Sequence, residues 1–375
     1  MPTYIWQDPN WPNWQYDLNT LNSPLAAIRH AQGRLLGKME SLGFQLRDET
    51  WLQTLTQDVL KTSQIENLQL DSEQVRSSLA QKLGLDVATL PRIDRHVEGI
   101  VEIMIDATRN YAAPLTAERL FAWHGALFPT GRSGLSAIRV ATWRDDANGA
   151  MQVISGPIGR EKVHYTAPPA ARLALEIQQF LTWFEQANEL DPVLKAGIAH
   201  LWLITLHPFD DGNGRIARAV GDMALARSEQ LSQRFYSLSA QIQQQRNDYY
   251  AILESTQKGN MNVTAWLLWF LNSLHAAIAQ AEQTIAVVLN KARTWEKLSN
   301  IALNPRQIKV LNKMLDGFEG NLTTSKWAKL AKCSQDTAHR DILKLIELKV
   351  LAKADSSGRS THYRLVVTAD KMPTL

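Results

Sequence analysis

An almost wholly apolar run, AGIAHLWLITL (residues 196–206), stops at His207-Pro208 and constrains the fold more than any other stretch. A helix that is apolar on all sides is buried, so this run predicts a helix in the centre of the core. Proline disfavours helical geometry in the residue before it, and the helix is therefore expected to end at His207. The polar loop DDGNG follows directly and must lie where the buried helix ends.

The residues in and after this loop can form an anion-binding site. Gly212 and Gly214 let the backbone approach a ligand closely, and a second helix is predicted to start near Gly214. The first N–H groups of a helix are unpaired and, with the helix dipole, attract an anion. Arg215 and Arg218 stand one turn apart, so both guanidinium groups can face the same anion.

Two more residues in this segment could take part in a reaction, one as a metal ligand and one as a base. Asp211 would repel a phosphate unless Mg²⁺ bridges the two groups. His207 has an ordinary pKa near neutrality and can accept a proton from a hydroxyl nucleophile. Together these residues favour phosphoryl or nucleotidyl transfer. The alternative is an ordinary helix-loop-helix with a capping aspartate and exposed arginines, because short glycine motifs recur by chance.

The whole segment HPFDDGNGRIAR (residues 207–218) resembles the Fic family motif, H-P-F-x-D-G-N-G-R-x-x-R, at all nine specified positions. The resemblance implies transfer of AMP from ATP to a hydroxyl side chain of another protein, with release of pyrophosphate. It implies that His207 is the base that deprotonates the target hydroxyl. By motif position it further implies Mg²⁺ at Asp211, the α- and β-phosphates at Gly212, Asn213 and Gly214, the β-phosphate at Arg215 and the γ-phosphate at Arg218.

Two other segments extend the resemblance. RNDYY (residues 246–250) is similar to the family's R-x-x-Y-Y, which implies that Tyr249 and Tyr250 lie beside the nucleoside. They could equally be packing aromatics. Residues 152–165 resemble the family's flap, a hairpin that captures a target segment as an added strand. The docking residues would be Val153, Ile154, Ser155 and Gly156, and a purely structural hairpin is the alternative.

An inhibitory segment is expected at TSQIEN (residues 62–67), which fits the family pattern [S/T]-x-x-x-E-[G/N] from Thr62 to Asn67. Glu66 extends the core-facing stripe of a helix over about residues 48–67, because Leu52, Leu55, Val59, Thr62 and Glu66 recur at spacings of three and four. A partly desolvated carboxylate needs a cation, and the resemblance nominates Arg218, so that the pair takes the place of the γ-phosphate. Asn67 tolerates a left-handed conformation and is expected to stop the helix. The alternative is a surface glutamate.

The expected fold is mainly α, with a Fic-type helical core. We expect an N-terminal helical domain (residues 1–110), the core with its flap (111–300) and a winged helix (303–375). A first helix is predicted to open at Ser23-Pro24. Ahead of the C-terminal region, residues 135–169 indicate strands, in RVATWR, MQVISG and KVHYTAPP. Near the C-terminus a helix-turn-helix is predicted with Ser334 as N-cap, followed by two strands around a Ser-Ser-Gly turn at residues 356–358.

Composition excludes some classes of protein. Cys333 is the single cysteine, which excludes an internal disulfide and a cysteine-based zinc site and suits a reducing compartment. The N-terminus lacks a secretory signal and no run reaches about 18 apolar residues, so we expect a cytoplasmic protein without a membrane span. Residues 303–375 carry 13 Lys and Arg against 7 Asp and Glu, and this basic region could contact DNA or a protein.

Two other functions stay open at this stage. The same site could remove AMP from a modified protein, with Glu66 positioning water. Alternatively, the chain could be a DNA-binding regulator whose Fic core only senses ATP. His207 favours an enzyme, because nucleotide sensing needs no base. Self-modification and a homodimer are also compatible with the sequence.

Overall fold

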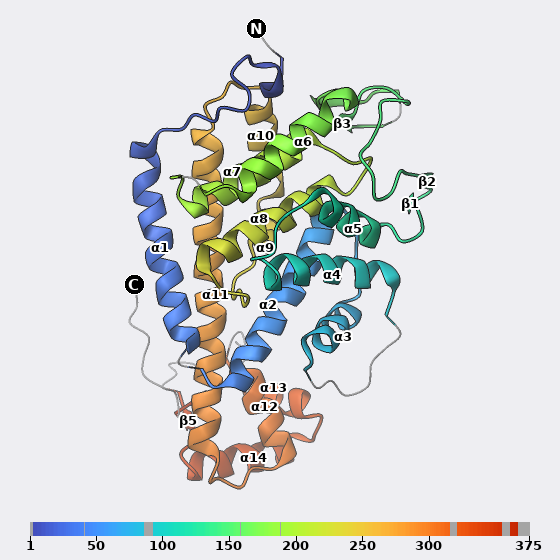
Figure 1. Cartoon of the computed structure of the whole chain (residues 1–375). Coiled ribbons are helices and arrows are strands. Elements are labelled where there is room, and N and C mark those ends of the chain that lie inside the picture. The colour runs from blue at the N-terminus through green and yellow to red at the C-terminus, as the bar shows by residue number, and fades with distance from the viewer. Residues whose placement is uncertain are drawn as a thin grey trace. The chain divides into compact units, whose positions relative to one another are not determined.

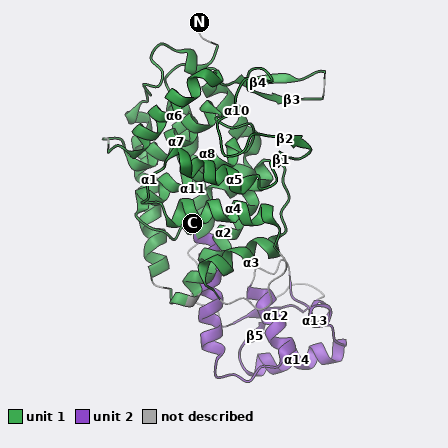
Figure 2. Ribbon diagram, turned by 45° about the vertical axis from the view of Figure 1, so that its right-hand side comes forward, with its two compact units in different colours: residues 1–281 green, residues 282–375 purple. Residues whose placement is uncertain are grey.

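A computed structural model describes residues 3–40, 42–85, 93–157, 159–187, 189–315, 321–354 and 361–366. The chain divides into two compact units, residues 1–281 and 282–375, shown in different colours in Figure 2. Both are mainly helical, and the strands of the described ranges form two-stranded antiparallel hairpins. The predicted mainly α fold is thus confirmed. No helix in the described ranges is long and apolar enough to cross a membrane.

The first unit begins with a short 3₁₀ helix, η1 (Ile5–Gln7). Its helices then follow as α1 (Leu18–Glu40), α2 (Phe44–Ile65), α3 (Ser72–Leu83), α4 (Arg95–Arg109), α5 (Ala117–Leu127), α6 (Ala170–Glu185), α7 (Pro192–Leu206), α8 (Asn213–Glu229), α9 (Leu238–Gln244) and α10 (Arg246–Gln257). The long α11 (Thr264–Leu298) contains the point of division. The strands are β1 (Arg132–Ser133), β2 (Ser136–Ala137), β3 (Gln152–Ser155) and β4 (Lys162–Thr166).

Helix α7 is the buried helix that the apolar run predicts. Every residue from Val193 to Leu206 is buried except Lys195, which is partly exposed. Helix α8 packs along one side of α7 (Figure 1). Helix α11 packs against another side, at Gly197, where an added Cβ would lie 3.0 Å from the Leu267 side chain. The core of the unit therefore surrounds α7, whose end carries the polar loop.

Two local predictions were wrong. Helix α1 begins at Leu18 and not at Ser23, because the Asp17 carboxylate accepts from the Asn19 N–H (2.9 Å) and acts as the cap. Pro24 is therefore inside the helix. The RVATWR segment (residues 139–144) forms no strand, since the Arg144 N–H donates to the Pro208 carbonyl (2.9 Å) instead of to a neighbouring strand.

The β3–β4 hairpin is fixed at its base. β3 and β4 pair antiparallel, with a register shift between Val153 and Ile154. At the base, the Trp6 indole N–H donates to the Thr166 carbonyl (2.9 Å). The buried Tyr165 hydroxyl donates to the Thr205 carbonyl in the last turn of α7 (2.7 Å). The hairpin thus starts beside the C-terminal end of the buried helix.

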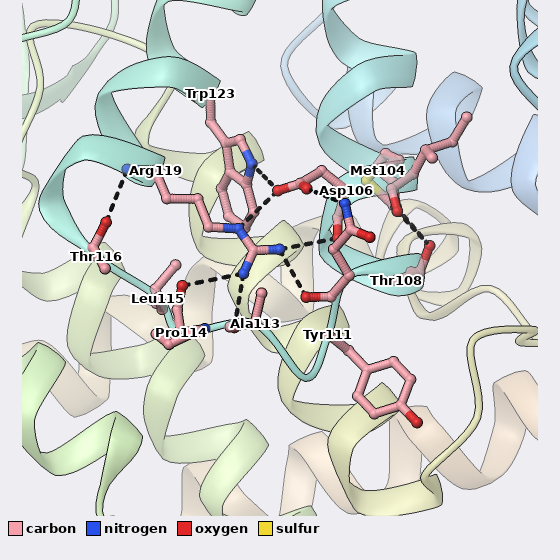
Figure 3. A network of polar contacts seen from close by, with 12 residues as sticks. Met104, Asp106, Thr108, Tyr111, Ala113, Pro114, Leu115, Thr116, Arg119 and Trp123 are labelled. Carbon is pink, nitrogen blue, oxygen red and sulfur yellow. Dashed lines mark hydrogen bonds and ion pairs between the residues drawn. The ribbon is translucent and has the colours of Figure 1, made fainter.

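Helices α4 and α5 are joined by a polar network centred on Arg119 (Figure 3). The Arg119 Nε donates to the Asp106 carboxylate (2.7 Å), which also accepts from the Trp123 indole N–H (2.8 Å). The helices approach so closely that a Cβ on Gly99 would lie 1.8 Å from the Ala126 carbonyl oxygen. This network fixes α5, which carries His124, a residue that contacts the α7–α8 loop.

The second unit contains the rest of α11, then α12 (Pro305–Leu315), α13 (Thr324–Ala331), α14 (Gln335–Glu347), β5 (Leu351–Lys353) and β6 (Tyr363–Leu365). Ser334 caps α14, since its hydroxyl accepts from the Thr337 N–H (3.2 Å), as predicted. Strands β5 and β6 pair antiparallel. The predicted Ser-Ser-Gly turn lies outside the described residues. A winged helix remains a prediction for this unit.

Candidate functional site

The loop between α7 and α8 is held closed by Asn213. Its side chain donates to the Phe209 carbonyl (Nδ2 to O, 2.8 Å), and its Oδ1 accepts from the Phe209 N–H (2.9 Å). His207 and Gly212 have φ values of 48° and 80°, so the chain turns through left-handed geometry at each end of the loop. The Asn213 side chain therefore shapes the loop, and the first N–H groups of α8 remain available for a ligand.

His207 is set up to accept a proton. Its Nδ1 lies 3.0 Å from the Ile204 carbonyl oxygen. A carbonyl can only accept, so the proton of the neutral imidazole is on Nδ1 and Nε2 is the acceptor. Burial lowers the pKa of His207 below its ordinary value, and the bond to Ile204 offsets this only in part. The imidazole is therefore neutral at pH 7.

Arg144 holds the backbone of the His207 turn. Its Nε donates to the His207 carbonyl (2.7 Å), and its own N–H donates to the Pro208 carbonyl (2.9 Å). Another guanidinium nitrogen donates to the Pro168 carbonyl at the end of the β3–β4 hairpin. The Arg144 side chain is fully buried. Nothing in the sequence near residue 144 pointed to this role, because the contact spans 63 residues.

Asp211 is oriented from two sides. Its carboxylate accepts from the Ser133 hydroxyl on β1 and from the Gly212 N–H. Its carbonyl oxygen lies 3.1 Å from Nε2 of His124 on α5. The Ala141 N–H donates to Nδ1 of His124 (3.2 Å), so Nε2 carries the proton and donates to Asp211. His124 is a positioning residue that the sequence did not reveal.

The donor set around Asp211 suits a magnesium ion that arrives with phosphate. The described residues hold no group of three or more histidine, cysteine and carboxylate side chains that could bind a metal by themselves. Mg²⁺ needs no such cage, because one carboxylate plus phosphate oxygens and water completes its shell. The neighbouring Asp210 carboxylate accepts from the Arg139 N–H (2.8 Å) and lines the same cavity as Asp211.

Arg218, on α8, is bound by the end of α2. Its Nε donates to the Thr62 hydroxyl (2.8 Å), and its Nη2 donates to both the Thr62 carbonyl (3.0 Å) and the Glu66 carboxylate (2.8 Å). Its Nη1 is buried without a hydrogen-bond partner in the part of the chain that the structure describes. Glu66 caps the end of α2, and Asn67 then adopts a φ of 60°. The cationic group is thus only partly satisfied by the protein.

The Glu66 carboxylate also covers the start of α8. A Cβ placed on Gly214 would lie 2.2 Å from Glu66 Oε1 and 3.1 Å from Arg218 Nη1. Only glycine leaves room for the carboxylate there. The first turn of a helix is an anion site, so Glu66 occupies the position that a phosphate would be drawn to.

These groups line one cavity of about 760 Å³. From the flap it is lined by Val153, Ile154 and Ser155, and from the loop and α8 by His207, Asp211, Gly212, Asn213, Gly214 and Arg218. Glu66, Asn67, Tyr249 and Tyr250 line it as well. Most of the predicted site residues therefore meet around one space of nucleotide size.

The two tyrosines of α10 differ in setting. Tyr249 is buried, and its hydroxyl lies 3.0 Å from Nε2 of the buried His200. Tyr250 is 38% exposed and lines the cavity. Arg246, one turn earlier, stacks over the Tyr250 ring (5.5 Å from guanidinium carbon to ring centroid) and also lines the cavity. The RNDYY segment contained Arg246, yet its contribution was not predicted.

Three predicted site residues do not line this cavity: Thr62, which holds Arg218 from the end of α2, Arg215 and Gly156. Arg215 is buried, and its guanidinium carbon lies 5.1 Å from the centroid of the Phe128 ring. Gly156 follows β3 with a φ of 104°, where an added Cβ would lie 2.9 Å from the Arg160 carbonyl oxygen. In this structure Arg215 therefore packs against an aromatic ring, and Gly156 shapes the flap turn.

Two family models match the chain. Residues 114–225 match the Fic/DOC family, and residues 4–85 match a family described as "Domain of unknown function (DUF4172)". The first match covers α5 and the following elements through most of α8, and so includes the loop and the flap.

Named proteins are similar to a part of the chain. The chain is 36% identical over 99 residues to "Protein adenylyltransferase Fic" of Drosophila grimshawi, covering 26% of this chain and 19% of that protein. It is 34% identical over 111 residues to the protein of that name from Drosophila mojavensis, covering 28% and 21%. The chain thus spans about a fifth of the length of these relatives.

Two solved structures share the fold. A Fic family protein from Desulfovibrio desulfuricans G20 aligns with a TM-score of 0.52 at 20% identity, over 99% of this chain and 100% of that one. A Fic domain containing signaling protein from Bacteroides thetaiotaomicron VPI-5482 aligns with a TM-score of 0.51 at 17% identity, over 70% and 94%. At these identities the likeness extends to the fold alone.

Proposed function

Residues 114–225 form a Fic/DOC domain, and from this premise we propose that the protein is an adenylyltransferase. It transfers AMP from ATP to a hydroxyl side chain of a target protein and releases pyrophosphate. The observation that carries the proposal is the neutral His207, with Nε2 as its acceptor, which lines the same cavity as Arg218 and the start of α8.

In the proposed reaction the chain binds the triphosphate at the start of α8. The free N–H groups of Gly214 and its neighbours receive the phosphates, and Arg218 supplies positive charge through its unpaired Nη1. Asp211 would hold Mg²⁺, which when bound neutralises phosphate charge. Arg215 joins the phosphate contacts only if its guanidinium leaves the Phe128 ring.

The chemical step needs one base. The target hydroxyl oxygen attacks the α-phosphorus, its proton passes to His207 Nε2, and the bond from phosphorus to pyrophosphate breaks. The Ile204 carbonyl keeps Nδ1 protonated, and Arg144 fixes the backbone that carries the ring. The lowered pKa keeps His207 able to accept a proton below neutral pH.

Glu66 is the proposed inhibitor of this reaction. Its carboxylate contacts Arg218 Nη2 and covers Gly214, where the outer phosphates would otherwise bind. A γ-phosphate brought to this place would meet a negative charge instead of a free guanidinium. ATP would then bind misaligned until the end of α2 moves.

The flap is the proposed docking site for the target. β3 pairs with β4 on one side, and within the described part of the chain its other edge pairs with no strand. An extended segment can add to such an edge through backbone hydrogen bonds, which tolerate many sequences. Ile154 is 54% exposed on β3 and offers an apolar contact.

DNA is the proposed partner of the second unit. On α14, Gln335, His339, Arg340 and Lys344 are exposed. A helix with exposed polar and basic groups can enter a major groove. Binding of the purified protein to duplex DNA, followed by fluorescence anisotropy, should weaken steeply with salt; salt-independent binding or none would remove this assignment.

The function is tested with labelled nucleotides. The purified protein and its Glu66→Gly variant are incubated with Mg²⁺ and labelled ATP, CTP, GTP or UTP, in the presence of a cell extract as a source of targets. We expect label from ATP to join protein covalently in the Glu66→Gly variant and to be absent with His207→Ala. Label transfer that persists in His207→Ala would refute the assignment of the base.

A further inference from the structure

Two stripes of side chains, one on α2 and one on α8, face each other at regular spacing. Each stripe has a member every four residues, so its members share one helix face: Asp58, Thr62 and Glu66 on α2, and Gly214, Arg218 and Asp222 on α8. Glu66 and Thr62 both bind Arg218. The remaining pair, Asp58 and Asp222, consists of two carboxyl groups whose charges act on each other. The stripe of α2 is therefore bound to α8 at one end and meets a group of like charge at the other.

Asp58 belongs to a buried cluster in which carboxyl groups outnumber the cation. Asp58, Asp222 and Arg234 are each at most 2% exposed, and Glu229, at the end of α8, acts on the same arginine. Arg234 Nη1 donates to the Asp222 carboxylate (2.5 Å). Asp58 accepts instead from the hydroxyl of Ser237, the N-cap of α9. Three carboxyl groups thus act on one guanidinium, and Asp58 is bonded to a neutral group.

The cluster favours a proton on Asp58. Within the described part of the chain, Asp222 Oδ2 is buried without a hydrogen-bond partner, so no donor stabilises additional negative charge at that oxygen. A buried carboxyl group without its own cation takes up a proton instead of remaining charged. Burial, and next the charge of Asp222, raise the pKa of Asp58 to about 7, although Arg234 and the hydroxyls of Ser237 and Ser239 offset this in part. Asp58 therefore gains or loses its proton close to neutral pH while α2 is in place.

We propose that the proton on Asp58 controls the inhibitory helix. With the proton, α2 stays on α8 and Glu66 stays on Arg218, which is the closed form. Without it, two carboxylates face each other, and residues 58–66 leave α8, which is the released form. This inference rests on the proposed function and adds to it a signal that acts on Glu66. Acid therefore strengthens the inhibition.

The pH range of this effect follows from linkage. In the released form Asp58 meets water, where the ordinary pKa of an aspartate is about 4. The closed form binds the proton more tightly, because burial beside Asp222 raises the pKa of Asp58 there to about 7. Between these two values the ratio of released to closed form should rise by up to about tenfold per pH unit. Above about pH 7 both forms have lost the proton, and the ratio should level off.

Hydrogen exchange measures the release of α2 without any reaction. The full-length protein is labelled in deuterated buffer from about pH 5 to about pH 7.5 without nucleotide, and rates for peptides from the end of α2 are corrected for the chemical pH dependence of exchange. We expect the corrected rate to rise about tenfold or more in the wild type and to stay flat in Asp58→Asn, whose amide does not ionise. Asp48→Asn is the matched control, because Asp48 lies on the same helix but is partly exposed; it should match the wild type.

The same proteins are compared by AMP transfer. At each pH the rate of each protein is divided by the rate of Glu66→Gly, in which no carboxylate covers the start of α8, so that the titration of His207 cancels. The ratio should rise with pH in the wild type and in Asp48→Asn, and it should stay low and flat in Asp58→Asn. Asp222→Asn removes the like charge on α8, so the rise in exchange and in the ratio should end at a lower pH than in the wild type.

The outcomes distinguish this inference from the proposed function. The same pH dependence of corrected exchange in the wild type and in Asp58→Asn would overturn this inference alone, and so would a rise that Asp222→Asn does not move. If exchange follows the expected pattern but no variant transfers AMP, Glu66→Gly included, the proposed function fails while the control of α2 by the Asp58 proton is supported.

Discussion

Replacing Glu66 tests whether its carboxylate blocks the proposed phosphate site. In Glu66→Gly, Arg218 keeps its two bonds to Thr62 and loses its bond to the carboxylate. A hydrogen bond between charged groups contributes roughly 1.5–3 kcal/mol net. If ATP must break this bond to align, its removal should raise the transfer rate by about 10- to 150-fold, since about 1.4 kcal/mol is tenfold.

The matched control for this change is Glu66→Gln. It keeps the volume over Gly214 but removes the negative charge, so its rate should lie between those of the wild type and Glu66→Gly. The assay is the initial rate of AMP incorporation from labelled ATP at saturating Mg²⁺. A Glu66→Gly rate no higher than that of the wild type would refute the argument that this carboxylate blocks the phosphate site.

The same substitution has a second readout in stability. Without Glu66 the buried Arg218 charge keeps only neutral partners, which should lower the free energy of unfolding by about 1–3 kcal/mol. Glu66 is itself about 30% exposed, so screening by water favours the lower end. ATP should raise the melting temperature of the variant more than that of the wild type, because it restores an anion to Arg218.

Three other substitutions test the surroundings of the site. Arg144→Lys loses the forked contact to the backbone at His207 and should lower kcat by about 10²-fold with KM for ATP little changed; an unchanged kcat would argue against the positioning role. Asp211→Asn should require about 10- to 150-fold more Mg²⁺ for half-maximal rate in a magnesium titration, and an unaltered titration would remove Asp211 as the metal ligand. Burial, and next the charge of Asp222, raise the pKa of Asp58 to about 7, so the native state holds a proton that the unfolded state releases near pH 4. Stability from this group is greatest below that pH and falls as pH rises to about 7, by at most about 1.4 kcal/mol per pH unit; urea unfolding of Asp58→Asn from pH 5 to 7 should show a smaller fall than the wild type, and equal slopes would contradict this.

Local patterns in the sequence predicted a large part of the fold and of the candidate site. The apolar run at residues 196–206 predicted the buried α7, and the spacing of Leu52, Leu55 and Val59 predicted which face of α2 is buried, since all three have at most 3% exposure. Glu66 continues that face, whereas its partner Arg218, 152 residues away, was nominated by the resemblance to the family motif. These features follow from periodicity and from side-chain chemistry within a few turns, which a sequence displays directly.

Short segments with mixed signals were less predictable. RVATWR has the composition of a strand, yet its backbone bonds to the loop after α7 and to His124. Helix α1 starts ahead of the Ser-Pro signal because Asp17 provides an earlier cap. In both cases a neighbour in space or a competing cap overrode the local preference.

The parts of the site that depend on distant residues were decided by the tertiary structure alone. Arg144 reaches His207, His124 reaches Asp211, and Glu254 reaches His164 across 90 residues. The sequence by itself determined which residues could do the chemistry and which helix ends would carry them. Only the fold determined the tautomer of His124 and which residues hold the backbone at His207 and Asp211, because these depend on hydrogen-bond partners that packing brings together from distant parts of the chain.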